Sequence, residues 1–386
     1  MLPKKILSWF AAGVALLLSV QVLADDFADA LAAYDKHDYS TAVQLFEPLA
    51  ERGDMRAALF LGAAYYTGLG VRFDRQESIG WMLQAQSSAS SADYDFVYGH
   101  WQTLADAGDP DAQVALGTAY NTGFGVPADP KKAFALMQQS AAQGYAPGQH
   151  GLGTMYASGD GVRKDAAEAF KWFSLAAEQG FTRAQGALAG MYQTGNGVKK
   201  DKAAAIAWLR RSADNGGTQE QYELGVIYSE GNGVRADHVE AVKWFRLAAA
   251  GGSPLAQNNL AVSYLKGTGV TKDLVMAYEF STLAMNGVNL VSPEFHQTIN
   301  LAFVTIGGKL NDAQRRVALF QLGERCRDGD GVPQDDVMAY RWMDMSIHDE
   351  PDEALRSARQ VERDALAARM RPDQVARAQT LSRSGL

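Results

Sequence analysis

Three patterns in this sequence of 386 residues combine residue types that can do chemistry. Ser263 and Lys266 have the spacing of the Ser-x-x-Lys motif, in which serine is a nucleophile, but the Ser-Asp-Asn and Lys-Thr-Gly motifs that accompany it are missing. Repeated Gly-x-Gly pairs resemble phosphate-binding loops, yet a helical pattern rather than a strand precedes each of them. The six histidines are scattered, with no pair at the i, i+4 spacing of a zinc site. We therefore expect no catalytic residue, no bound metal and no cofactor.

The single cysteine, Cys326, limits both redox and metal chemistry. One thiol forms no intramolecular disulfide and no thiolate cluster for a metal. Cys326 stands where other copies of a repeat described below have tyrosine, which favours a buried apolar role over a reactive thiol. The formal net charge of −8 is opposite to that of a nucleic-acid-binding surface, so nucleic-acid partners are excluded.

The glycine pairs fall on a repeat that organises most of the chain. Gly-x-Gly-Val recurs seven times, and five successive copies, beginning at Gly123, are spaced by 36 residues. Tyrosine stands three residues before the first glycine in six copies, and aspartate stands six residues after it in all seven. A fixed period of this length is typical of repeat proteins built from small supersecondary units.

Each repeat predicts two helices. Around Gly195, the apolar residues Ala184, Leu188 and Tyr192 fall on one face of a first helix, which the glycines end. Asp201 then caps a second helix. Asp165 with Glu168, and Asp237 with Glu240, match the capping box, in which the two side chains exchange bonds with the helix amides. The predicted fold class is all-α, with antiparallel helix pairs stacked into an α/α solenoid.

The same signals divide the chain. We expect a solenoid over 25–350, with core repeats over 109–287, insertions near 91–108 and 288–312, and a C-terminal helical cap over 351–386. The second insertion predicts a helix from Glu294 to Ile306, with Asn311 capping the next one.

The repeat resembles that of a known family. The residues that carry the resemblance are Ala184, Leu188, Tyr192, Gly195, Gly197, Val198, Asp201, Ala205, Trp208, Ala213 and Gly216. This pattern is similar to the Sel-one-like repeat, a relative of the tetratricopeptide repeat, and the resemblance covers about Ala42 to Ser346. It implies a right-handed superhelix that acts as a scaffold or adaptor for protein complexes, and exported bacterial members are implicated in cell-envelope processes.

The first 24 residues predict an export signal. Lys4 and Lys5 precede an apolar run that ends at Val22 and Ala24, which is the layout of a secretory signal peptide cleaved after Ala24. The alternative is an uncleaved membrane anchor, because the run approaches the roughly 20 residues that span a bilayer. Cleavage would leave no membrane span and place the protein in the periplasm or outside the cell.

One polar position also repeats. Glutamine occupies the same place on five successive first helices, at Gln113, Gln149, Gln185, Gln221 and Gln257. We interpret these glutamines, with their neighbours Tyr222, Glu223, Asn258 and Asn259, as a surface that contacts a protein partner. The alternative is that glutamine is simply a good helix former at a solvent-facing position.

The predicted function is a non-catalytic scaffold or adaptor that binds protein partners in the cell envelope. The alternative is a protein that binds peptidoglycan or an exopolysaccharide through aromatic side chains of the two insertions, with Tyr94, Phe96, Tyr98 and Phe295 as candidates.

Overall fold

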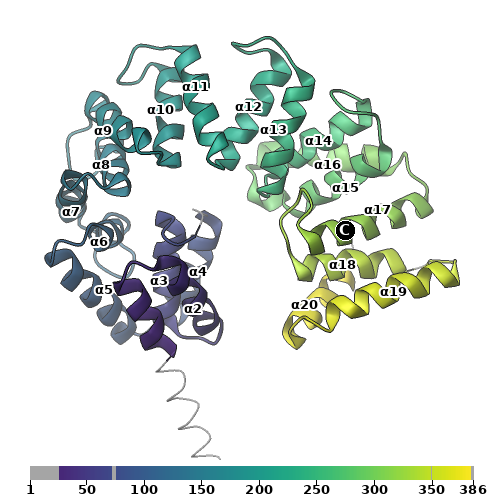
Figure 1. Ribbon diagram of the computed structural model, residues 1–386, viewed down its shortest axis with the longest axis horizontal. Helices are drawn as coiled ribbons and strands as arrows, with labels where there is room; N and C mark the ends of the chain where they lie inside the picture. The colour runs from purple at the N-terminus through teal and green to yellow at the C-terminus, as the bar shows by residue number, and fades with distance from the viewer. Residues whose placement is uncertain (1–25, 72–74, 349, 384–386) are drawn as a thin grey trace, which may run out of the picture. The chain divides into compact units, whose positions relative to one another are not determined.

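The structure is a computed structural model, and it describes residues 26–71, 75–348 and 350–383 (Figure 1). The predicted signal peptide and the N-cap at Asp74 lie outside these residues. The described residues form helices and turns without a strand, which confirms the all-α fold class of repeated helix pairs. Two compact units divide the chain at Phe181 and Thr182, a division that the repeat pattern did not predict.

The first unit begins with helical residues 26–35. Its further helices are α2 (Tyr39–Glu51), α3 (Met55–Thr67), α4 (Arg75–Ser88), α5 (Ser91–Asp106), α6 (Pro110–Thr122), α7 (Pro130–Ala142), α8 (Ala146–Ser158) and α9 (Ala166–Glu178). α3 packs against α4, α6 against α7, and α8 against α9, as pairs of a first and a second helix. The first insertion forms α5, which lies against α3 and α6.

The second unit continues the same pairing. Its elements are α10 (Thr182–Thr194), α11 (Lys202–Asp214), α12 (Thr218–Glu230), α13 (His238–Ala250), α14 (Pro254–Lys266), α15 (Leu274–Asn286), the 3-10 turn η1 (Val288–Leu290), α16 (Pro293–Gly307), α17 (Asp312–Asp328), α18 (Asp336–Ile347), α19 (Glu353–Ala367) and α20 (Pro372–Arg383). The second insertion forms η1 and α16, and α19 and α20 cover α18 at the C-terminal end.

In the pairs from α6 and α7 to α14 and α15, a backbone hydrogen bond closes the turn between the two helices. The amide of the capping aspartate donates to the carbonyl of the repeated tyrosine, as from Asp201 to Tyr192 at 3.0 Å. The Asp201 side chain then accepts the amide of Ala204 and starts α11. Gly195 and Gly197 lie between them with φ of +78° and +75°, a conformation that glycine adopts without a Cβ clash. The recurring spacing of tyrosine, glycines and aspartate therefore encodes one local turn.

The capping boxes differ from the prediction. Asp165 accepts the amides of Ala167 and Glu168, but the Glu168 side chain pairs with Lys171 at 3.5 Å. Reciprocal boxes form instead at Ser90 with Asp93 in α5, and at Asn311 with Gln314 in α17. The Glu168 side chain can bond either the backbone amide of Asp165, as in a capping box, or the Lys171 side chain. Lys171 competes for it because residues three apart lie on the same face of a helix.

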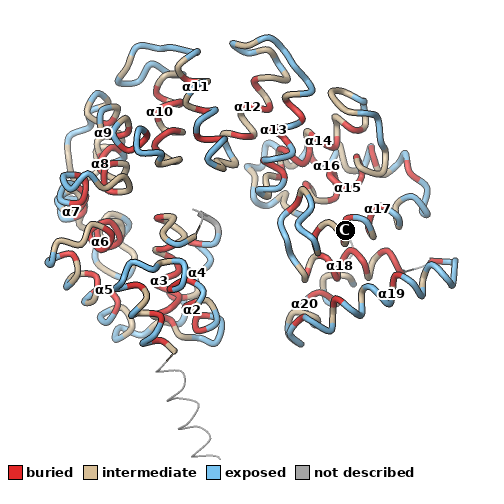
Figure 2. The backbone as a smooth tube through the Cα atoms, in the orientation of Figure 1, coloured by how far each residue is buried: buried red, intermediate tan, exposed pale blue. Residues whose placement is uncertain are grey.

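Small residues let the helices approach closely in both cores. In helices such as α9 and α11, the side that faces neighbouring helices is buried and the opposite side is exposed, whereas α15 and α18 are buried on more than one side (Figure 2). A Cβ atom on Gly153 of α8 would lie 2.8 Å from the Phe173 ring of α9, so glycine is needed for this approach. Phe46, Phe60 and Trp101 lie in the core of the first unit, and Trp342 and Leu322 lie in that of the second.

Candidate functional site

The five repeated glutamines do not form an exposed ladder. Each lies on the buried side of its first helix, and only 3 to 7% of its surface is exposed. Asn258, a further predicted contact residue, is buried as well. The prediction that these side chains face solvent is therefore wrong. The period of 36 residues brings equivalent residues into line, but it does not say whether the next helix covers them.

The buried glutamines join successive helices by hydrogen bonds. The Gln113 side chain donates to the carbonyl of Ala105 at 3.2 Å and accepts from Gln143 at 3.0 Å. The bond from Gln143 to Gln113 has equivalents in the next two repeats. Gln179 donates to Gln149 at 2.7 Å, and Asn215 donates to Gln185 at 3.1 Å. Because a buried amide is costly unless it is hydrogen-bonded, this position is glutamine for structural reasons.

We expect Gln113→Leu to lower the free energy of unfolding by about 1–3 kcal/mol. The leucine side chain makes no hydrogen bond, so the carbonyl of Ala105 and the side-chain amide of Gln143 each lose their bond to residue 113. Gln138→Leu, at an exposed position of α7, is the control and should cost less than about 0.5 kcal/mol. Urea unfolding followed by circular dichroism measures both. Equal costs would contradict the structural role of Gln113.

Tyr222, Glu223 and Asn259 remain as candidate contact residues. Each is partly exposed on a first helix, at α12 or α14. First helices of successive pairs also contact each other, as α12 contacts α14. The partly exposed side chains of these two helices therefore belong to neighbouring segments of the same surface.

The aromatic residues proposed for glycan binding differ in their exposure and in the unit to which they belong. Tyr98 is buried, and its hydroxyl donates to the carbonyl of Phe124 at 2.6 Å. Tyr94 stacks on Tyr98 with ring centroids 6.0 Å apart, while Phe96 contacts the Arg56 guanidinium. Phe295 lies on α16 in the other unit. Tyr94 and Tyr98 therefore pack within their own unit, whereas Phe96 is 41% exposed.

The chemical motifs have structural roles where the structure describes them. The Ser263 hydroxyl donates to the carbonyl of Asn259 within α14 at 2.8 Å, as many helical serines do. Cys326 is buried, as predicted, and burial raises the pKa of its thiol to about 12, so the thiol stays protonated. Among the described residues, no group of three or more His, Cys, Asp or Glu side chains lies close enough to hold a metal ion.

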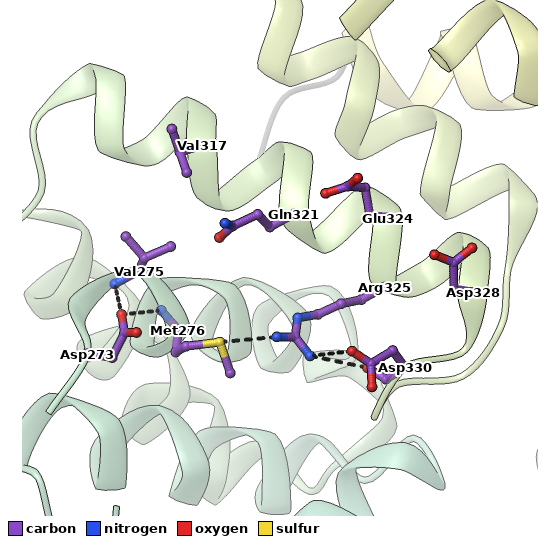
Figure 3. Close-up of a pocket in the computed structure, with 9 residues that line it drawn as sticks. All are labelled: Asp273, Val275, Met276, Val317, Gln321, Glu324, Arg325, Asp328 and Asp330. Atoms are coloured by element: carbon purple, nitrogen blue, oxygen red, sulfur yellow. Dashed lines mark hydrogen bonds and ion pairs between the residues drawn. The ribbon is translucent and has the colours of Figure 1, made fainter. Parts of the chain in front are cut away.

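A groove of about 560 Å³ lies between α15 and α17 (Figure 3). Its lining residues are Asp273, Val275, Met276, Val317, Gln321, Glu324, Arg325, Asp328 and Asp330. Gln321 and Arg325 extend from α17 toward Met276 at the start of α15, as Figure 3 shows. The groove combines three apolar side chains with four carboxylates and one guanidinium.

A buried carboxylate lies behind the groove. Glu279 of α15 is 2% exposed, and its Oε2 atom lies 3.0 Å from Nε of Arg325. Its Oε1 atom receives no hydrogen bond from the described residues. Burial raises the pKa of Glu279 to about 7. The Arg325 guanidinium lowers this pKa by a smaller amount, and the nearby carboxylates of Asp273 and Asp330 raise it further.

Sequence reasoning missed Glu279 because its repeat position is exposed elsewhere. The equivalent residues of three preceding repeats, Lys171, Ala207 and Lys243, are exposed on their second helices. At α15, the following insertion brings α17 against the side of the helix that is open in those repeats. A polar residue at this position carries no sequence signal of burial, because the covering helix begins more than 30 residues later.

We expect the stability of the wild-type protein relative to Glu279→Gln to fall as the pH rises from about 4.5 to about 7. The folded state holds the Glu279 proton up to about pH 7, whereas the unfolded chain releases it near its ordinary pKa of 4.5. Raising the pH through this window therefore favours unfolding of the wild type. Above pH 7, Glu279→Gln should be more stable by about 1–3 kcal/mol.

Urea unfolding at a series of pH values measures this difference between the two proteins. Taking the difference removes the contributions of the other titrating groups, which the two proteins share. A pH-independent difference would contradict the elevated pKa of Glu279.

The stacked helix pairs define an α/α repeat protein of the tetratricopeptide-like class. The Sel1 repeat model matches eight stretches of the chain, at 33–54, 56–85, 110–145, 146–181, 182–217, 221–253, 254–285 and 316–348. The chain therefore belongs to the Sel1 repeat family, which confirms the resemblance in the sequence. Proteins of this family generally mediate protein–protein interactions. No curated protein matches the chain.

Several solved structures are similar to the chain. A Sel1 repeat protein from Oxalobacter formigenes is 30% identical over 73% of this chain and 89% of its own, with a TM-score of 0.49. The protective antigen c5321 of uropathogenic Escherichia coli is 24% identical over 95% of this chain and 84% of its own, with a TM-score of 0.36. A putative Sel1 repeat protein from Klebsiella pneumoniae is 22% identical over 54% of this chain and 99% of its own, with a TM-score of 0.35.

No helix in the described part of the chain is both long enough and apolar enough to cross a membrane.

Proposed function

We propose that this protein is an exported, non-catalytic adaptor that binds protein partners in the cell envelope. One observation carries the proposal: the recurring alanine, glutamine and leucine positions of the first helices, such as Ala184, Gln185 and Leu188, are buried and hold the helices together. The partly exposed positions of the first helices vary instead, as Glu223 and Asn259 illustrate. An array that keeps its packing residues and varies its surface residues is suited to binding another macromolecule.

The sequence before the described residues supports the location. Lys4, Lys5, the apolar run and Ala24 have the order that a secretory signal peptide requires. N-terminal sequencing of the protein purified from its host tests this part. Asp25 as the first residue is the expected result, and retention of the first 24 residues would overturn cleavage after Ala24.

The interaction is tested by cross-linking in the native host, followed by affinity purification and mass spectrometry. A stoichiometric envelope protein is the expected product. The Glu223→Lys, Asn259→Arg double variant should lose this product if the surface of α12 and α14 binds the partner. The control is Glu178→Lys with Ala207→Arg, which makes the same charge change at exposed positions of α9 and α11.

Other outcomes have distinct meanings. Recovery of cell-wall or polysaccharide fragments alone, together with co-sedimentation with purified sacculi, would replace the adaptor by a glycan-binding protein. Retained capture by both double variants would overturn the assignment of this surface but not the adaptor function.

A further inference from the structure

The groove between α15 and α17 has a charge distribution that selects for cations. Arg325 is the guanidinium that lines it, and its donors are already engaged. Its Nε atom pairs with Glu279, Nη1 donates to Asp330 at 3.1 Å, and Nη2 lies 3.4 Å from the Met276 sulfur. An anionic ligand would have to displace these partners, so the groove is poorly suited to phosphate or carboxylate groups.

The carboxylates of the groove differ in how they are satisfied. Asp273 accepts the amides of Val275 and Met276 as the N-cap of α15. Asp328 pairs with Arg327 at 2.7 Å. Glu324 has no hydrogen bond or ion pair with the described residues. Its pKa is raised by partial burial and by the nearby acidic residues Glu362 and Asp328, with Arg327 acting in the opposite direction.

Glu279 lies behind the lining of the groove and engages the one guanidinium that lines it. Its carboxylate is almost fully buried directly behind Arg325, and Oε1 has no hydrogen-bond donor among the described residues. A buried, incompletely satisfied carboxylate costs stability, and groups of this kind cluster at functional sites. The groove itself is lined by four carboxylates and by one guanidinium, which is already paired, so it presents a net negative field to a ligand.

The apolar wall adds a second recognition element. Val275 and Met276 on α15 and Val317 on α17 line the groove, and all three side chains are at least partly exposed. A peptide in extended conformation points successive side chains to opposite sides, so one segment can offer both a cation and an apolar group to such a surface.

We propose that this groove binds an extended, basic segment of a partner protein, with a lysine or arginine paired to Glu324 and an apolar side chain against Val275, Met276 and Val317. This proposal rests on the adaptor function. It names the groove as the binding site and a basic segment as the part of the partner that is bound. Pairing would replace the acidic repulsion around Glu324 by attraction in a partly desolvated place, where a charge pair is worth more than at an open surface.

Fluorescence anisotropy with a labelled heptapeptide tests the proposal. The peptide alternates lysine or arginine with leucine or valine, and its counterpart carries glutamate at the basic positions. We expect the basic peptide to bind the wild-type protein and the acidic peptide not to bind. Glu324→Lys should weaken binding by about tenfold or more, and Glu324→Gln should weaken it less.

The matched control is Asp214→Lys, which makes the same charge change at an exposed position of α11 in the same unit. It should change the dissociation constant by less than about twofold at physiological ionic strength, because distant surface charges are screened. Val317→Asn tests the apolar wall and should also weaken binding. Circular dichroism melting of each variant confirms that it is folded.

Absence of binding to the wild-type protein overturns the proposal. Undiminished binding of the basic peptide by Glu324→Lys also overturns it. Equal losses of affinity in Glu324→Lys and Asp214→Lys overturn it as well, because they would indicate long-range attraction to an acidic protein. Cross-linking in the host separates this proposal from the adaptor function. If Glu324→Lys still captures the wild-type partner, the groove assignment fails and the adaptor function stands. If the wild-type protein captures no partner, the adaptor function itself fails.

Discussion

Gly269→Ala is expected to destabilise the second unit by several kcal/mol, on the order of 3–5. Gly269 is the second glycine of its Gly-x-Gly-Val turn and has φ of +73°. An added Cβ would lie 2.2 Å from the carbonyl oxygen and 2.5 Å from the carbonyl carbon of His238, which belong to the backbone of α13. Because a helix backbone cannot move aside as a flexible side chain can, the turn must shift away from the neighbouring repeat.

The matched control is Gly331→Ala in the same unit. Gly331 occupies the same turn position with φ of +71°, but an added Cβ would meet no atom within 4 Å. This substitution should cost only the left-handed conformation, about 1–2 kcal/mol. Urea unfolding by circular dichroism compares the two. If both variants lose the same stability, the glycine is required for its backbone angle alone and not for the contact between repeats.

Glu350→Ala is expected to cost about 3–5 kcal/mol by leaving two arginines without their shared carboxylate. Glu350 precedes α19 and is buried, with Oε2 lying 3.1 Å from Nε of Arg316 and 2.9 Å from Nη1 of Arg359. Arg359 is buried and also donates to the carbonyl of Ser346 at 3.0 Å. The network therefore ties α17, α18 and α19 together at the C-terminal end of the second unit.

The expected consequence is local as well as global. Native-state hydrogen exchange should show faster exchange of the α19 amides in Glu350→Ala than in the wild type, because α19 loses its buried anchor. The control is Glu362→Ala on the same helix, which removes a partly exposed ion pair with Arg327 at 3.1 Å. That pair should be worth less than about 1 kcal/mol. Equal effects of the two substitutions would show that the buried network contributes no more than the partly exposed pair.

The sequence by itself determined the fold, because the interactions that define each repeat are local. The turn from Tyr192 to Asp201 spans ten residues, and its glycines, its cap and its closing hydrogen bond all lie within that span. Local interactions of this kind leave a pattern that recurs with the period of the repeat. The helix pairs, the burial of Cys326 and the membership in the Sel1 repeat family could all be predicted from it.

The tertiary structure decided which polar residues are buried. Gln185 and Glu223 are both polar residues on first helices, yet one is buried and bonded to Asn215 while the other is partly exposed. The difference arises from helices about 30 residues away, whose packing the local sequence does not specify. The predicted surface of glutamines was therefore wrong, although the alignment of these residues along the array is real.

The groove is the clearest case. Its two sides come from α15 and α17, which are separated in sequence by the insertion that forms η1 and α16. The packing of α17 against α15 buries Glu279 and places Glu324, a residue of α17 itself, on the rim of the groove without an ion-pair partner among the described residues. Burial and pairing of charged groups depend on the whole surroundings of a side chain, whereas capping and turn formation depend on a few neighbouring residues. For this reason the sequence determined the repeat, and only the tertiary structure revealed the candidate binding site.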